Sequence, residues 1–212
     1  MAKIGSQLFT AEGPEAVERV ARLVSGIFLD LKFCDIPNTV AGAVAAAVKL
    51  PKVRMLTLHT TGGLEMMCAA RGALKGVKNP PTLLGVTILT SLDDQALGRI
   101  GLAGPAESRV VALALLAQEA GMGGIVASAR EVEAVRMAVG PKMRIVVPGV
   151  RPATPDGNGK TDDQTRVATP GSAIRSGADY LVVGRPITGA ANPAKTADAI
   201  LLEMKAARKS RS

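Results

Sequence analysis

The sequence predicts an α/β protein built on a parallel sheet. Hydrophobic residues make up 47% of the 212 residues, which is enough for one sizeable core and short for two. Aromatic residues are only 2% of the chain, whereas aliphatic residues and 23 glycines are abundant, a composition suited to helices packed closely on a sheet. Short apolar runs alternate with longer segments of helical periodicity. We therefore expect a single α/β domain spanning residues 1–212.

The elements can be placed by these runs and by the turn residues between them. Strands are expected at residues 2–5, 26–32, 55–60, 83–89, 124–128, 144–148 and 179–184. Helices are expected near residues 14–24, 39–49, 63–75, 106–120, 130–138, 170–176 and 193–208. Thr169–Pro170 and Asn192–Pro193 are typical helix starts, and Gly177 suits a left-handed helix exit.

The strand count leaves the topology open. Each strand is followed by a helix long enough for a crossover, so parallel pairing is expected. A closed (β/α) barrel needs eight strands, and this sequence supplies seven, the first of which begins at Ala2. The chain is therefore either an open doubly wound sheet or a barrel whose first strand and helix precede Met1.

Charge and composition exclude several classes of protein. The net charge of +8 favours an anionic partner, although half of it comes from a basic tail that we expect to fray, formed by Lys205, Arg208, Lys209 and Arg211. One Tyr and three Phe give little material for stacking nucleic-acid bases. No apolar run approaches the roughly 20 residues of a membrane span, and no signal-peptide pattern is present. We expect a cytoplasmic protein that binds neither nucleic acid nor membranes.

The most informative stretch is FLDLKFCDIPNT at residues 28–39. In a strand, side chains two residues apart share a face, so Asp30 and Lys32 are expected to point together at the strand's carboxyl end. Asp35 lies just beyond, before a helix N-cap region expected at Asn38 and Thr39. Barrel enzymes keep their active sites at this end. The alternative is an ion pair that merely closes the rim of the barrel.

A second polar stretch follows the strand at residues 144–148. The loop after it is long enough to be a functional lid and carries Asp163, Gln164 and Arg166. The last strand then delivers Gly184 and Arg185, which are suited to binding a phosphate through a backbone N–H and a guanidinium. A lone Gly-Arg pair is weak support for a phosphate site, and the lid that precedes it strengthens that support.

The single histidine and the two cysteines are weaker indications of a functional site. His59 ends a strand and is expected to be packed and hydrogen-bonded rather than in direct contact with a ligand. Cys34 and Cys68 are expected to be inert and to behave as small hydrophobic residues. One histidine and two scattered cysteines provide no zinc site, so no metal is expected.

Several blocks together resemble a known family. DLKFCDIPNTV resembles the D-x-K-x-x-D-I-P-N-T signature of orotidine monophosphate decarboxylases. TLHTTGG, GVTILTS, VVPGVRP, DQTRVATP and GADYLVVGRPIT resemble further blocks of that family in the same order, and the likeness covers essentially the whole chain. The resemblance implies a TIM (β/α)8 barrel that decarboxylates orotidine 5'-monophosphate to uridine 5'-monophosphate in de novo pyrimidine biosynthesis. It implies no metal and no cofactor.

The resemblance also assigns catalytic roles. It implies that Lys32 protonates the pyrimidine carbon after CO2 departs, and that Asp30 sits beside the departing carboxylate. Lys3 would join this charge network and touch the sugar. Asp35 and Thr39 would be supplied to the neighbouring subunit's site across a homodimer.

Substrate-binding roles follow from the other blocks. The resemblance implies that Ser91 hydrogen-bonds the pyrimidine and that Gln164 bridges base and phosphate. Gly184 and Arg185 would bind the phosphate, and Pro148 in VVPGVRP would also contact the substrate.

This sequence departs from the family pattern at its front. Members begin with a strand ending in an aspartate that binds the ribose hydroxyls, and nothing here matches it, because Lys3 already corresponds to the second strand. The resemblance therefore favours a barrel that lacks its first strand in this chain. Smaller departures are Cys34, where bacterial relatives often carry His, and Thr60–Thr61 in place of Ala-Ser.

Two other functions stay open. One is a related Mg²⁺-dependent barrel, such as a sugar-phosphate decarboxylase or hexulose-phosphate synthase, which shares D-x-K-x-x-D. The other is an inactive truncated barrel that only binds nucleotide through Gly184 and Arg185.

Overall fold

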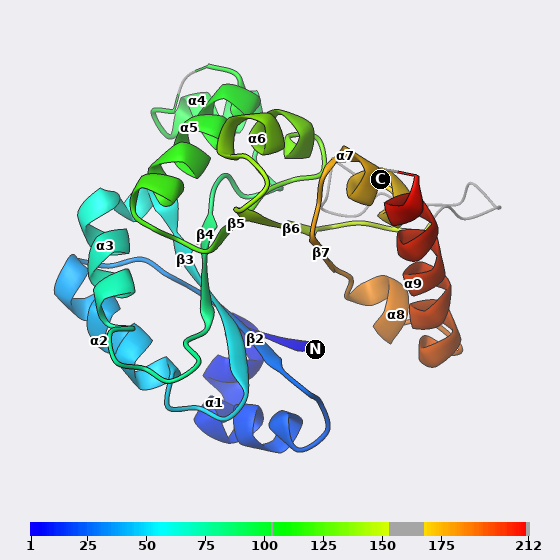
Figure 1. The fold of residues 1–212 in the computed structure, drawn as a ribbon, viewed down its shortest axis with the longest axis horizontal. Helices are drawn as coiled ribbons and strands as arrows, with labels where there is room; N and C mark the ends of the chain where they lie inside the picture. Colours follow the sequence, from blue (N-terminus) through cyan, green and yellow to red (C-terminus); the bar gives the residue numbers. More distant parts are fainter. Residues whose placement is uncertain (103, 153–167, 211–212) are drawn as a thin grey trace. The chain divides into compact units, whose positions relative to one another are not determined.

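Seven strands form the sheet of the computed structural model, which describes residues 1–102, 104–152 and 168–210 (Figure 1). They follow one another in chain order, from β1 to β7. Their bounds are β1 Ala2–Gly5, β2 Ile27–Phe33, β3 Val53–His59, β4 Thr82–Val86, β5 Gly124–Val126, β6 Arg144–Pro148 and β7 Tyr180–Val182. Each of the seven predicted strands is thus present, within a few residues of its expected bounds.

Helices connect the strands, as the alternating pattern predicts. They are α1 Ser6–Ala21, α2 Pro37–Ala47, α3 Leu64–Gly72, α4 Asp94–Arg99, α5 Ala106–Glu119, α6 Val132–Val139, α7 Pro170–Ser176, α8 Arg185–Thr188 and α9 Pro193–Lys209, with a 3-10 turn, η1, at Thr60–Gly62. The predicted start signals are confirmed, because the Thr169 side chain accepts from Ser172 N and Asn192 accepts from Lys195 N. Gly177 leaves α7 at a φ of 122°.

Contacts between Cα atoms divide the chain into two compact units. The first unit comprises residues Met1–Thr87 and Leu113–Ile125, and the second comprises Ile88–Ala112 and Val126–Ser212. The single-domain organisation expected from the sequence stays a prediction.

The first unit holds β1 to β4 in parallel register. Ile4 pairs with Leu29, and Leu29 with Leu56, so fully buried aliphatic side chains lie side by side across the strands. The carbonyl of Leu83 then accepts a hydrogen bond from the N–H of Gly123, the residue before β5. Helix α1 packs on β1 and β2, and α2 packs on α3 (Figure 1).

Two features of the first-unit helices differ from expectation. Helix α1 starts at Ser6 rather than near residue 14, because the chain is helical on both sides of a break at Gly13, where φ is 63° and Pro14 follows. Helix α2 begins at Pro37, with Ile36 in the N-cap position. The expected N-cap region at residues 38 and 39 is therefore wrong, since Pro at the first helical position sets the start earlier.

The second unit holds β6 and β7, again in parallel. Arg136 of α6 joins them: its guanidinium donates to the carbonyls of Gly140, Met143 and Gly177 and pairs with the Asp179 carboxylate. Helix α7 packs on α9, the last helix in Figure 1. Helix α9 continues through Lys209, so the helix predicted over residues 193–208 is confirmed, while the expected fraying of its basic end stays a prediction and Arg211 lies outside the described residues.

The two cysteine thiols lie at the surface. Cys34 and Cys68 are both exposed, and their expected inertness stays a prediction. Met66, Met67 and Met122, in contrast, are buried in the core. Within the described residues, no helix combines the length and the apolar character that a membrane span requires.

Candidate active site

The carboxyl ends of β1 and β2 bring three charged side chains together. Asp30 is 8% exposed, and its two carboxylate oxygens are divided between two lysines. Lys32 Nζ lies 2.9 Å from Oδ1, and Lys3 Nζ lies 3.1 Å from Oδ2. The backbone brings Lys3 into place, because Gly5 of β1 pairs with Asp30 of β2. We call Lys3, Asp30 and Lys32 the charge cluster.

The two lysines keep Asp30 ionised. Burial by itself raises the pKa of a carboxyl group, but the hydrogen bond and charge of Lys32, followed by those of Lys3, outweigh it and hold the pKa of Asp30 below the usual 3.8. Both lysine side chains are about one third exposed, at 35% of their surface. The cluster thus presents two cations to solvent around one buried anion at neutral pH.

The strand is not regular where the cluster forms. Leu29 of β2 pairs with Leu56, but Phe33 pairs with Leu58, so β2 uses two more residues than β3 over this stretch. Lys32 adopts a φ of 52°, a left-handed conformation that costs a non-glycine residue roughly 1–3 kcal/mol. Asp30 and Lys32 meet through this bulge, and not through the simple alternation that the sequence suggests.

Two residues of β3 complete the surroundings. Thr57 is fully buried and hydrogen-bonds both Asp30 Oδ1 and the backbone N–H of Lys32. His59 is half-buried at the end of the strand. The sequence analysis did not single out Thr57. The feature that could have indicated it is a hydroxyl residue inside the apolar run MLTLH, on the strand that follows the one carrying the charges.

The pKa of His59 depends on its burial and on the charges of Lys32 and Asp30. Burial lowers its pKa below the usual 6.5, the positive charge of Lys32 lowers it further, and Asp30 acts in the opposite direction. We expect the imidazole to titrate below pH 6.5, because protonation adds a charge in a poorly solvated place. Since the unfolded chain binds this proton more readily, the free energy of unfolding should fall as the pH drops through that range.

The measurement is NMR of the imidazole on tag-free protein, where the chain's one histidine gives an unambiguous signal. Lys32→Ala should raise the His59 pKa, and Asp30→Asn should lower it. Unchanged titration in both variants would contradict the electrostatic coupling.

Among the described residues, Asp35 and Thr39 make no ion pair or hydrogen bond with the charge cluster of their own chain. Both are exposed, and the Asp35 carboxylate accepts a hydrogen bond from the N–H of Ile36, which is itself 67% exposed. Among the described residues no ion pair joins Asp35 to Lys32. Asp35 thus lies in the turn between β2 and α2, as its place in the sequence predicts, and its role in a site stays a prediction.

The remaining expected site residues belong to the second unit. Ser91 is exposed in the turn between β4 and α4, and Pro148 ends β6. Gly184 and Arg185 are exposed at the start of α8, directly after β7. The carbonyl of Gly184 accepts from the N–H groups of the following turn, and a side-chain carbon at Gly184 would meet nothing within 4 Å. Gln164, like Asp163 and Arg166, lies outside the described residues.

Comparison with protein families decides the assignment. The profile described as "Orotidine 5'-phosphate decarboxylase / HUMPS family" matches residues 1–200, which include every expected site residue. The chain belongs to this family.

Curated relatives and solved structures agree with the orotidine 5'-phosphate decarboxylase branch of the family. The chain is 56% identical to a protein of that name from Anaeromyxobacter sp. (strain K), over 93% of this chain and 84% of the relative. It is 49% identical to a protein of the same name from Idiomarina loihiensis, over 94% and 84%. A crystal structure of orotidine 5'-phosphate decarboxylase from Lactobacillus acidophilus matches with a TM-score of 0.82 and 34% identity, covering 95% of this chain and 85% of that one. The predicted TIM-barrel fold class is confirmed.

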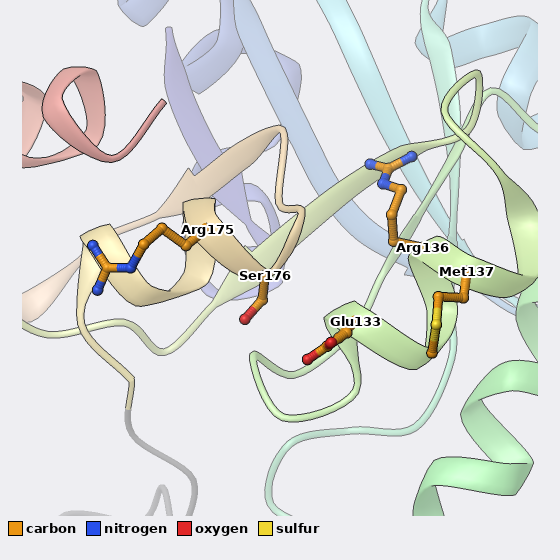
Figure 2. Close-up of a pocket in the computed structure, with 5 residues that line it drawn as sticks. All are labelled: Glu133, Arg136, Met137, Arg175 and Ser176. Atoms are coloured by element: carbon orange, nitrogen blue, oxygen red, sulfur yellow. The ribbon is translucent and has the colours of Figure 1, made fainter. Parts of the chain in front are cut away.

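One hollow of the second unit is lined by none of the expected site residues. It has a volume of about 380 Å³ and is lined by Glu133, Arg136, Met137, Arg175 and Ser176. In Figure 2 the Arg136 and Arg175 side chains extend away from one another, and the Arg136 guanidinium is engaged by backbone carbonyls and Asp179. The Arg136 guanidinium thus links α6 to the residues just before β7.

The expectation of no metal, which rests on one histidine and two scattered cysteines, stays a prediction. Within the part of the chain that the structure describes, no group of three or more His, Cys, Asp or Glu side chains is arranged to hold a metal ion.

Proposed function

We propose that the charge cluster is the catalytic centre of an enzyme that decarboxylates orotidine 5'-monophosphate to uridine 5'-monophosphate in pyrimidine biosynthesis. The activity is that of curated relatives about half identical to this chain over more than nine tenths of its length. The observation that carries the assignment of the centre is the buried Asp30 held between two partly exposed lysine ammonium groups. A fixed cation beside a fixed anion suits a reaction that moves negative charge from a carboxylate onto a carbon.

The reaction explains why a lysine is needed. Loss of CO2 from the pyrimidine leaves a carbanion in the plane of the ring, with no attached group to delocalise its electrons. The Lys32 ammonium stabilises this charge as it forms and then donates a proton to the carbon. Asp30 keeps Lys32 protonated and oriented, and lies beside the departing carboxylate. Lys3 binds the other carboxylate oxygen of Asp30 and reaches the sugar.

The exposed segment after β2 supports a shared site in a homodimer. Within the part of the chain that the structure describes, Asp35 and Thr39 are exposed and form no ion pair or hydrogen bond with the charge cluster of their own chain, and the neighbouring Ile36 is 67% exposed. Asp35 and Thr39 therefore serve the partner subunit's site, where Asp35 adds a second carboxylate beside Lys32 and Thr39 holds the ribose. A cytoplasmic location stays a prediction.

The substrate's phosphate is bound by residues of the second unit. Gly184 and Arg185 follow β7, and loops after the last strands of this fold class commonly bind phosphate. Arg185 supplies a guanidinium that pairs with two phosphate oxygens, and Gly184 supplies a backbone N–H. Gln164 bridges phosphate and base, and Ser91 and Pro148 contact the pyrimidine. This binding energy, remote from the reacting carbon, lowers the barrier by holding the ring in place.

CO2 release from orotidine 5'-monophosphate tests the proposed function. The purified chain should convert this substrate, and turnover should persist after treatment with a metal chelator, because the charge cluster supplies its own cations. A chelator-sensitive reaction that prefers a sugar phosphate would instead indicate a Mg²⁺-dependent barrel of the same family. Uridine 5'-monophosphate binding without any turnover would indicate an inactive barrel.

Arg185→Ala tests the phosphate contact within the same assay. We expect kcat/KM for the nucleotide to fall about 100-fold or more, since a charge-assisted bidentate contact is lost, while the weak turnover of orotidine, which has no phosphate, changes little. Arg175→Ala, which removes an exposed arginine of the same unit, is the matched control and should leave both substrates unaffected. Equal losses for nucleotide and nucleoside would count against the phosphate assignment.

A further inference from the structure

Thr57 occupies the point where the bulge of β2 would otherwise leave a backbone group unpaired. The register between β2 and β3 is interrupted from Leu29 to Phe33, and the N–H of Lys32 lies within the interruption. That N–H donates to Thr57 Oγ1 at 2.9 Å. Lys32 is the residue of the bulge with a left-handed backbone. Its N–H bonds to the Thr57 hydroxyl instead of to a backbone carbonyl of the neighbouring strand.

The same hydroxyl also holds Asp30. Because the Lys32 N–H can only donate, the Thr57 hydroxyl accepts there and directs its single proton to Asp30 Oδ1, 2.9 Å away. Oδ1 receives the Lys32 ammonium as well, at 2.9 Å. The result is a closed ring of hydrogen bonds from the Lys32 backbone through Thr57 and Asp30 to the Lys32 side chain. Thr57 is 0% exposed, so water does not compete for its bonds.

We infer that Thr57 is a positioning residue for the reaction: its hydroxyl fixes both ends of Lys32, the backbone directly and the ammonium through Asp30. The inference rests on the proposed function of the charge cluster and adds to it a residue of a third strand. A lysine side chain has four rotatable bonds, and a proton donor displaced by a fraction of an ångström from its carbon loses much of its effect.

Three variants separate positioning from stability. Thr57→Val keeps the shape and removes the hydroxyl, and Thr57→Ser keeps the hydroxyl. Thr60→Val is the matched control. Thr60 is also 0% exposed, and its hydroxyl donates to the carbonyl of Val86 and not to Asp30. The variant therefore also loses one buried hydroxyl hydrogen bond. All three are assayed with orotidine 5'-monophosphate, and thermal unfolding is measured alongside.

We expect Thr57→Val to lower kcat about 10- to 100-fold while KM changes little, since substrate binding does not depend on the ring of hydrogen bonds. Thr57→Ser should restore most of kcat. Thr60→Val should lower the melting temperature by a similar amount and leave kcat near that of the wild type. If Thr57→Val does not fold, Thr57→Ala replaces it in the comparison with Thr57→Ser.

The pH profile gives a second readout. Losing a donor to its carboxylate makes Asp30 easier to protonate, so the acid limb of kcat should move to higher pH in Thr57→Val. The charged and titratable groups that surround Asp30 are Lys3 from β1, Lys32 from β2 and His59 from β3, and NMR of His59 in the same variant shows whether the histidine causes the shift.

Three results would overturn the inference: an unchanged kcat in Thr57→Val, an equal loss of kcat in Thr60→Val, or no rescue by Thr57→Ser. A wild-type chain that releases no CO2 would instead refute the proposed function, so the two failures are distinguishable.

Discussion

Lys32→Ala is expected to abolish turnover of orotidine 5'-monophosphate while binding of uridine 5'-monophosphate stays measurable. The variant loses both the cation that stabilises the carbanion and the proton that quenches it, and we expect kcat to fall by about 10³-fold or more. It also leaves the buried Asp30 with Lys3 as its remaining lysine partner, so the pKa of Asp30 should rise. Steady-state kinetics and product binding by calorimetry measure the two effects.

Lys52→Ala is the matched control. Lys52 is a lysine of the same unit with the same left-handed backbone, at a φ of 58°, but its ammonium donates to the carbonyls of Ala21 and Val24. Its loss should lower thermal stability and leave kcat unchanged. Near-normal turnover in Lys32→Ala, or an equal loss in Lys52→Ala, would remove Lys32 from the proposed mechanism.

The fold was predictable where local chemistry decides it. Helix α7 begins and ends at the predicted residues, because Thr169 caps it, Pro170 starts it and Gly177 ends it. The short helices α4 and α8 were missed, since six and four residues carry too little hydrophobic periodicity to stand out.

The site was predictable in its residues but not in its geometry. The D-x-K spacing indicates that Asp30 and Lys32 act together, yet nothing in FLDLKF marks Lys32 for a left-handed backbone. That conformation depends on a tertiary contact, the Thr57 hydroxyl on the next strand, and sequence periodicity does not report contacts 25 residues apart. Thr57 was therefore missed for the same reason as the bulge.

Asp35 illustrates a different limit. Its position five residues after Asp30 suggests a second carboxylate at the same centre, but the chain turns at Ile36 and Pro37 into α2, which leaves Asp35 exposed. Residue spacing does not distinguish a group that serves its own chain from one that serves a neighbour. An experiment on mixed dimers does.

Mixing two inactive variants is expected to restore activity if Asp35 acts across a dimer. Lys32→Ala and Asp35→Ala should each be nearly inactive alone. In a mixed dimer, the Asp35→Ala chain keeps its own Lys32 and receives Asp35 from the partner, so one of the two sites is complete. With random exchange in a two-fold dimer, equal amounts of the variants should recover about a quarter of the wild-type activity.

The charge cluster supplies the control for this mixing experiment. Asp30 and Lys32 form their ion pair within one chain, so mixing Asp30→Asn with Lys32→Ala leaves every site with one defect, and activity should stay near zero. Recovery with Asp35→Ala but not with Asp30→Asn locates Asp35 in the partner's site, because the two experiments differ only in which carboxylate is removed. Equal recovery in both mixtures would mean that the proposed division of the site between subunits is wrong, and no recovery in either would mean that Asp35 acts within its own chain.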